Sequence, residues 1–358
     1  MGITAKEQMI SFYPGPSKLT DHIEQYLADA VKSGILSINH RQEEFVRLVE
    51  ATVLGLKEYL KVPKEYEVYF VNSATECWYI IGNSIVDDSV AHLYNGDFGK
   101  KWSDVDKNLG HNTLDIRFDI NKEIPTQFIQ DVSLICLTHC ETSNGTILSD
   151  NSLSLLRKNN SEALIALDAT SSMGGVRIDF TNIDLCFASV QKCFGLPSGL
   201  GILICSPRAV KRATELNRNN YFHHLKHLHE KALLFQTCNT PNMLGIYLLN
   251  RVLKARTELN HVENALQKNA RLIYQFFDDY KNGFQLLVRN ESARSPTVVT
   301  VLGDPSKINQ IKLDAKSNGI ILGNGYGEWA KNTFRIANFP AHNEDDFLQL
   351  FHFFNQYK

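Results

Sequence analysis

The chain has 358 residues, of which 43% are hydrophobic and 21% are charged, an ordinary composition for a folded globular protein. Its 37 basic and 39 acidic side chains give a formal net charge of −2, so the charge indicates no nucleic-acid partner and no binding to an anionic membrane surface. No run of about 18 apolar residues is present, which argues against a membrane span. The seven cysteines form no CxxC pair and the first residues lack a signal-peptide core, so we expect a reducing, cytoplasmic setting.

Short apolar runs alternate with longer helical stretches in the first two thirds of the chain. Several runs are continuous in Val, Ile and Leu, which is typical of strands buried on both faces of a parallel sheet. The pattern predicts a three-layer α/β/α unit with a mostly parallel sheet. The expected strands are residues 68–71, 90–94, 133–138, 163–168, 185–190 and 201–205, and the expected helices are 21–33, 43–60, 75–86, 149–158 and 207–216.

The pattern of apolar and polar residues changes after about residue 244. The pattern predicts one long helix at about 242–281, then strands at 284–288, 297–301 and 333–336 with helices at 306–317 and 345–357. These elements predict a smaller α/β unit, with an antiparallel or mixed sheet and helices on one side. We therefore expect a large domain of residues 16–245 and a small domain made of residues 1–15 and 246–358.

Two reactive side chains follow apolar strand candidates. Asp168 closes the run at 163–168, and Lys192 comes just after the run at 185–190. Because ligands in parallel α/β sheets bind at the carboxyl ends of the strands, we expect both side chains at one crevice. A lysine amine that is desolvated there has a lowered pKa and becomes nucleophilic, which suits Schiff-base chemistry.

Two further segments could contact an anion or a ring. Residues 72–76 join a strand to a helix with small side chains, so backbone N–H groups there can bind a phosphate, and Thr142 also lies just past a strand. Each feature alone has an ordinary explanation: a helix cap for Asp168, a solvated turn for Lys192 and a plain helix start at 72–76. Together they match pyridoxal 5′-phosphate, which needs an imine lysine, an acid partner for its ring nitrogen and a phosphate site.

Three motifs carry a resemblance to a known family. Gln191-Lys192-Cys-Phe-Gly195 is similar to a Gln-Lys-x-x-Gly lysine motif, His40-Arg41-x-x-Glu-Phe45 to a Ser-His-Arg-x-x-Glu-Phe segment, and Asn239-Thr240-Pro241 to an Asn-Thr-Pro segment. The chain thus resembles the class V aminotransferases among the fold-type-I pyridoxal phosphate enzymes, and within them the phosphoserine aminotransferase family. The resemblance extends over nearly the whole chain.

This resemblance implies transamination of phosphoserine with 2-oxoglutarate, to 3-phosphohydroxypyruvate and glutamate, as in serine biosynthesis. It implies that Lys192 forms the Schiff base and moves the substrate proton, that Asp168 pairs with the pyridinium nitrogen, and that Arg335 binds the substrate α-carboxylate. It also implies a homodimer with shared active sites. The other implied contacts are Phe98 stacked on the ring, Thr142 beside it, Ala74, Thr75, Glu76 and Gln191 at its phosphate, Asn239 and Thr240 at the phosphate of the partner subunit's cofactor, and His40 and Arg41 at the distal anionic group of the substrate.

One departure from the family affects the substrate. Where the family carries a His-Arg pair a few residues before the carboxylate-binding arginine, this chain reads Gly327-Glu328-Trp329-Ala330-Lys331-Asn332. Glu328 would repel a phosphate, and Lys331 could replace the missing cations only as a point charge. Three alternatives stay open: an aminotransferase of an unphosphorylated amino acid such as serine or alanine, with glyoxylate or pyruvate as acceptor; a cysteine desulfurase-like lyase; and a non-catalytic binding protein.

A histidine-rich stretch is the most conspicuous polar cluster. His223 and His227 have the i, i+4 spacing that could bind a metal on a helix, but no HExxH pattern accompanies them. We interpret the stretch as a surface loop or the rim of an active site and expect no metal site.

Overall fold

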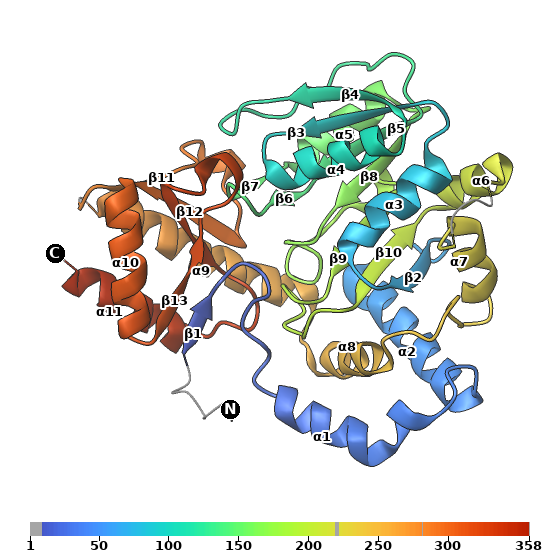
Figure 1. The fold of residues 1–358 in the computed structure, drawn as a ribbon, viewed down its shortest axis with the longest axis horizontal. Helices are drawn as coiled ribbons and strands as arrows, with labels where there is room; N and C mark the ends of the chain where they lie inside the picture. Colours follow the sequence, from blue (N-terminus) through green and yellow to red (C-terminus); the bar gives the residue numbers. More distant parts are fainter. Residues whose placement is uncertain (1–8, 219–221, 281, 358) are drawn as a thin grey trace.

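The computed structural model of the protein describes residues 9–218, 222–280 and 282–357 (Figure 1). Within these residues lie a seven-stranded sheet, a five-stranded sheet and a two-stranded ribbon. The ribbon pairs β6 (Cys140–Glu141) with β7 (Thr146–Ile147), and short 3₁₀ helices punctuate the loops. These are η1 (Ile35–Ser37), η2 (Phe180–Asn182), η3 (Glu291–Ala293) and η4 (Gly327–Trp329).

The large sheet has the strand order β2-β10-β9-β8-β5-β3-β4. The run from β9 to β4 is parallel, whereas β10 is antiparallel to both neighbours, so the predicted mostly parallel sheet is confirmed. The edge strand β4 was not predicted, because its sequence alternates polar and apolar residues and is largely exposed. The strands are β2 (Glu67–Val71), β3 (Ser89–Tyr94), β4 (Asn112–Arg117), β5 (Leu134–Thr138), β8 (Leu164–Asp168), β9 (Leu185–Ser189) and β10 (Gly201–Cys205).

Alternate strand residues point into two separate hydrophobic cores. In β5, Ile135 and Leu137 belong to one core, and Leu134 and Cys136 to the other. Helices cover both faces of the sheet, as the predicted three-layer arrangement requires (Figure 1). The first face carries α1 (Ile23–Ser33), α2 (Glu43–Leu60), α5 (Asp150–Asn159) and α8 (Met243–Ala255), and the second carries α3 (Ala74–Ile85), α4 (Asp97–Asn108), α6 (Pro207–Leu216) and α7 (Leu225–Ala232).

The prediction of one long helix at 242–281 is wrong. The stretch forms two helices, α8 and α9 (Leu259–Asp279), and the backbone of Arg256 between them is extended. The Arg256 guanidinium donates hydrogen bonds to the carbonyl oxygens of Gly174, at 2.9 Å, and of Cys193. The break therefore depends on contacts with distant loops, which helical periodicity does not reveal. Side chains of α8 belong to the core with α2, whereas α9 packs against the small sheet.

The small sheet combines the two ends of the chain. Its order is β1-β13-β14-β12-β11, and β1 is parallel to β13 while the other pairs are antiparallel, so the sheet is mixed. Figure 1 shows the N-terminal strand lying beside the C-terminal elements. The division into domains at 15/16 and 245/246 stays a prediction. The elements are β1 (Ile10–Phe12), β11 (Phe284–Leu286), β12 (Val298–Gly303), β13 (Ile320–Asn324), β14 (Thr333–Ala337), α10 (Pro305–Ser317) and α11 (Glu344–Gln356).

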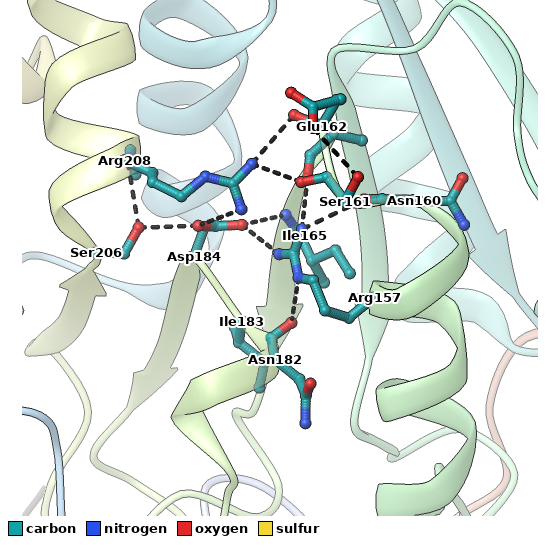
Figure 2. Close-up of polar contacts among 12 residues, drawn as sticks. Arg157, Asn160, Ser161, Glu162, Ile165, Asn182, Ile183, Asp184, Ser206 and Arg208 are labelled. Atoms are coloured by element: carbon teal, nitrogen blue, oxygen red, sulfur yellow. Dashed lines mark hydrogen bonds and ion pairs between the residues drawn. The ribbon is translucent and has the colours of Figure 1, made fainter.

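A buried carboxylate joins several elements at the amino ends of β8 and β9 (Figure 2). Asp184 accepts hydrogen bonds from the Arg157 guanidinium, from the backbone N–H of Ile165 at 3.0 Å and from the Ser206 hydroxyl at 3.0 Å. Arg208 approaches the same carboxylate at 3.7 Å. This network fixes α5 and α6 to the sheet at the edge opposite the carboxyl ends. None of the described helices is both long and apolar enough to cross a membrane.

Candidate active site

The carboxyl ends of β5, β8 and β9 open into a cavity of about 250 Å³. Segments from the large sheet, the N-terminal strand and the small sheet all reach it. Eight of the predicted site residues line it: Ala74, Thr75, Phe98, Thr142, Asp168, Gln191, Lys192 and Arg335. The other lining residues are Tyr13, Pro14, Gly15, Pro16, Ser73, Trp78, Thr138, Cys140, Thr170, Ser189 and Tyr326.

Lys192 follows β9 and is 6% exposed. Its Nζ donates hydrogen bonds to Thr142 Oγ1 and Ser171 Oγ, each at 2.8 Å. Burial lowers the pKa of Lys192 from 10.5 to about 8, although the carboxylate of Asp168 acts in the opposite direction. The amine is therefore held in place and is readily deprotonated, as a nucleophile or general base must be.

Asp168 ends β8 and is also buried. Its Oδ1 accepts hydrogen bonds from the backbone N–H of Thr170 at 2.9 Å and from the Thr170 hydroxyl at 2.5 Å. Burial raises the pKa of Asp168, while these hydrogen bonds and the charge of Lys192 oppose the rise. The carboxylate therefore lies fixed in an apolar wall, where a cationic partner would stabilise its charge.

Phe98 lies in the first turn of α4, and its ring centre is 5.4 Å from Lys192 Nζ. Tyr326 stacks on this ring with the centroids 5.1 Å apart and the planes 11° from parallel. The backbone N–H groups of Phe98 and Gly99 donate to the buried carboxylate of Glu141, at 3.5 and 3.2 Å. A side chain at Gly96 would lie 2.2 Å from Glu141 Cγ, so glycine is needed at that close approach. Glu141 thereby fixes the start of α4 and the place of the ring.

The first turn of α3 forms another part of the wall. Ser73 caps the helix by accepting a hydrogen bond from the N–H of Glu76 at 3.1 Å, and the N–H of Ala74 donates to Ser189 Oγ at 2.7 Å. Glu76 is absent from the cavity lining formed by the described residues. Its carboxylate is turned to Asn72 and His223 instead.

Two side-chain oxygen atoms at the cavity are buried without a hydrogen-bond partner among the described residues. They are Oε1 of Gln191 and Oγ1 of Thr138. Such atoms cost free energy unless a ligand or water satisfies them. A polar ligand with an anionic group fits this lining, since a helix N-terminus and a buried amine face the same space.

Arg335 projects from β14 of the small sheet and is 3% exposed. Its Nε donates to the carbonyl oxygen of Asn324 at 2.6 Å and its Nη1 to that of Thr142 at 2.8 Å. Burial lowers the pKa of Arg335 to about 10, which still leaves it a cation at neutral pH. These contacts hold the guanidinium at the cavity, suited to binding a carboxylate.

The remaining predicted residues lie together outside this cavity. Thr240 Oγ1 is 3.3 Å from Nδ1 of His40, and Arg41 Nη1 donates to Gln236 Oε1 at 2.8 Å. Neither they nor Asn239 are part of the cavity lining in the described chain. The structure thus separates the predicted site residues into a cavity set and a second, largely exposed set.

The chain matches the aminotransferase class-V family over residues 14–327. It belongs to this family. The phosphoserine aminotransferase of Rhodococcus jostii is 29% identical, covering 94% of this chain and 91% of that protein, and the putative phosphoserine aminotransferase of Mycobacterium leprae is 30% identical, covering 95% and 92%. A crystal structure of a phosphoserine aminotransferase from Cytophaga hutchinsonii superposes with a TM-score of 0.93 at 31% identity, covering 98% of this chain and 99% of that one.

Membership of this family confirms the predicted fold, enzyme class, cofactor and substrate class. The fold is that of the fold-type-I aminotransferases, the protein is a pyridoxal phosphate-dependent aminotransferase, and its substrates are amino acids and 2-oxo acids. Pyridoxal 5′-phosphate fits the cavity because Lys192, Asp168 and the unpartnered Thr138 hydroxyl lie on its wall. Glu141 and Tyr326 were missed by sequence reasoning, since their partners are distant in sequence.

Proposed function

We propose that the protein transfers the amino group of phosphoserine to 2-oxoglutarate, giving 3-phosphohydroxypyruvate and glutamate. The curated relatives carry the phosphoserine aminotransferase name and match more than nine tenths of this chain. The observation that carries the proposal is the meeting of Lys192, Asp168 and Arg335 at one cavity.

Bound pyridoxal phosphate supplies a carbonyl carbon that takes up the amino group and a ring that withdraws electrons from the substrate. Lys192 Nζ accepts the proton from the substrate Cα, because its lowered pKa leaves part of the amine neutral at pH 7. The hydroxyls of Thr142 and Ser171 orient this amine. Asp168 would pair with the ring nitrogen of the bound cofactor and keep it protonated, and Phe98 would stack on the ring.

The cavity has one anion site for the substrate and another for the cofactor. Arg335 binds the α-carboxylate in a bidentate pair, since its other contacts fix the plane of the group. Ala74, Thr75 and Gln191 bind the cofactor phosphate at the start of α3. Glu76 was placed in this set from the sequence, but its amide is taken by Ser73, so we assign it no phosphate contact.

His40 and Arg41 bind the distal phosphate of the substrate. The charge of Glu328, which argued against a phosphate, is compensated by an ion pair with Arg117 at 2.6 Å. Both side chains are exposed, so the pair is screened by solvent.

Four predicted residues act in a homodimer. His40, Arg41, Asn239 and Thr240 lie outside the cavity of their own chain, which supports their reaching the site of a second copy. In such an assembly Asn239 and Thr240 bind the phosphate of the partner subunit's cofactor.

A cytoplasmic location is part of the proposal. All seven cysteines fall in the described chain and are free thiols, which supports a reducing compartment.

Half-transamination of the bound cofactor tests the substrate. Phosphoserine and glutamate should each shift the cofactor absorbance, and serine and alanine should leave it unchanged at the same concentrations. The lack of the family's His-Arg pair in residues 327–332 favours the alternative of an unphosphorylated amino acid. A shift with serine or alanine and none with phosphoserine would establish that alternative.

A further inference from the structure

A histidine joins the first turn of α3, which borders the cavity, to the second set of site residues. His223 precedes α7 and is 7% exposed. Its Nδ1 forms a hydrogen bond with Glu76 Oε1, and its Nε2 lies 3.2 Å from Asn239 Oδ1. The two partners are 163 residues apart along the chain by their numbers, 239 and 76, so the ring joins segments that have no local reason to meet.

Both partners of the ring accept hydrogen bonds. The carboxylate of Glu76 can only accept when ionised. The amide nitrogen of Asn239 donates to the carbonyl oxygen of Thr240 at 3.4 Å, which leaves the amide oxygen facing the histidine. Both ring nitrogens must then donate, so His223 is present as the imidazolium.

The electrostatics agree with this protonation. The hydrogen bond that His223 donates to Glu76 raises the pKa of His223 above its usual value, with burial acting against the rise. Burial alone would raise the pKa of Glu76, but hydrogen bonds from His223 and Asn72 lower it. Glu76 on α3 is the charge that faces the His223 ring. The exposed ring of Phe222 packs against the same imidazole, with the two ring centroids 4.8 Å apart.

Glu76 in turn belongs to the first turn of α3. Its Oε2 accepts from the backbone N–H of Asn72 at 2.7 Å and from Asn72 Nδ2 at 2.9 Å. The neighbouring residues Ala74 and Thr75 line the cofactor cavity. On the other side of the bridge, Thr237 Oγ1 donates to the carbonyl oxygen of Asn239 at 2.7 Å.

We propose that His223 is a positioning residue that, by donating from both ring nitrogens, fixes Asn239 against α3 so that Asn239 and Thr240 reach the partner subunit's cofactor phosphate. This inference rests on the proposed function, in which those two residues act across a homodimer. The bridge exists only while the ring is protonated. Because the folded pKa is raised, the bridge persists above pH 6.5 and is lost as the pH rises through the raised value.

The first test compares cofactor affinity in two matched variants over a range of pH. In His223→Gln both N–H donors are on one nitrogen, so the side chain cannot reach two acceptors on opposite sides of the ring. The dissociation constant of pyridoxal phosphate should therefore rise about 10-fold at pH 6, the loss of one charge-assisted hydrogen bond. The ratio to the wild-type constant should fall towards one at high pH. The control is His227→Gln on α7, a half-exposed residue 3.5 Å from Glu230, whose ratio should stay near one throughout.

Glu76→Gln provides a second, independent reading. Removing the carboxylate lowers the pKa of His223, so the pH at which cofactor affinity falls should move down. This variant tests the bridge even if His223→Gln does not fold. An unchanged pH profile in Glu76→Gln, or a His223→Gln ratio of one at pH 6, overturns the proposal.

Mixed dimers show which subunit's site depends on the bridge. One dimer carries Lys192→Ala in one subunit and His223→Gln in the other; a second dimer carries both substitutions in the same subunit. The intact Lys192 site should bind the cofactor with wild-type affinity in the first and about 10-fold more weakly in the second. Equal affinities, the reverse order or a monomeric protein overturn the proposal. If wild-type protein shows no phosphoserine reaction while these affinities behave as expected, the substrate assignment fails and the bridge stands.

Discussion

Replacing Asp168 with asparagine tests how the cavity controls the protonation of Lys192. With a pKa of about 8, roughly one tenth of the Lys192 amine is neutral at pH 7, against about 0.03% for an ordinary lysine at 10.5. The cavity therefore raises the reactive fraction about 300-fold. Asp168 is the leading charge that opposes this effect, so Asp168→Asn should lower the Lys192 pKa further and enlarge the neutral fraction.

Reductive methylation of the cofactor-free protein measures this directly. Formaldehyde and cyanoborohydride label neutral amines, and mass spectrometry of the Lys192 peptide gives the labelling rate at each pH. We expect a midpoint near pH 8 in the wild type and at lower pH in Asp168→Asn. Exposed Lys211 on α6, with a side chain 76% exposed, serves as the internal reference for the reagent. A wild-type midpoint near 10.5, or an upward shift in the variant, refutes the reasoning.

Three other substitutions test the site and the framework. Arg335→Gln should raise KM for phosphoserine and for glutamate about 100-fold while the cofactor absorbance is unchanged, because a buried bidentate carboxylate contact is lost. KM values equal to those of the wild type contradict this. Asp184→Ala should lower the free energy of unfolding in urea by about 3–5 kcal/mol, since it leaves the part-buried Arg157 without its carboxylate and the buried N–H of Ile165 without its acceptor, and should not change cofactor affinity; a loss below about 1 kcal/mol contradicts this. Phe334→Ala, at a fully buried position of the small sheet, should cost about 3–5 kcal/mol in the same assay, and a neutral result would mean that the small sheet unfolds separately.

The central strands could be predicted because each is a continuous apolar run. The same rule did not predict α4, because its sequence is rich in charged residues and its start depends on the distant carboxylate of Glu141. It also predicted α8 and α9 as one helix, because apolar periodicity continues across Arg256. Elements specified by long-range contacts leave little trace in local sequence.

The same distinction holds in the site. Asp168 and Lys192 could be predicted from position, because parallel register brings the carboxyl ends of β8 and β9 together. Tyr326 carries no local signal, since its stacking on Phe98 joins residues more than 200 positions apart in the chain. The side chain of Glu76 shows the limit of motif reasoning, because its carboxylate is directed to Asn72 and His223 and not into the cavity.

The pairing of β1 with β13 has a consequence for synthesis of the chain. Ile10 leaves the ribosome first, but its strand partner Ile320 follows about 300 residues later, which takes about 15–60 s at typical elongation rates. The large sheet is complete once β10 has emerged, so it can form well before that time. Residues 13–16 line the cavity and are followed by Ser17, whose N–H donates to the carbonyl oxygen of Gln191, but their second anchor, β1, is paired only afterwards. The nascent protein therefore holds an unfinished cofactor site, with β1 unpaired and available to chaperones, until β13 has been made.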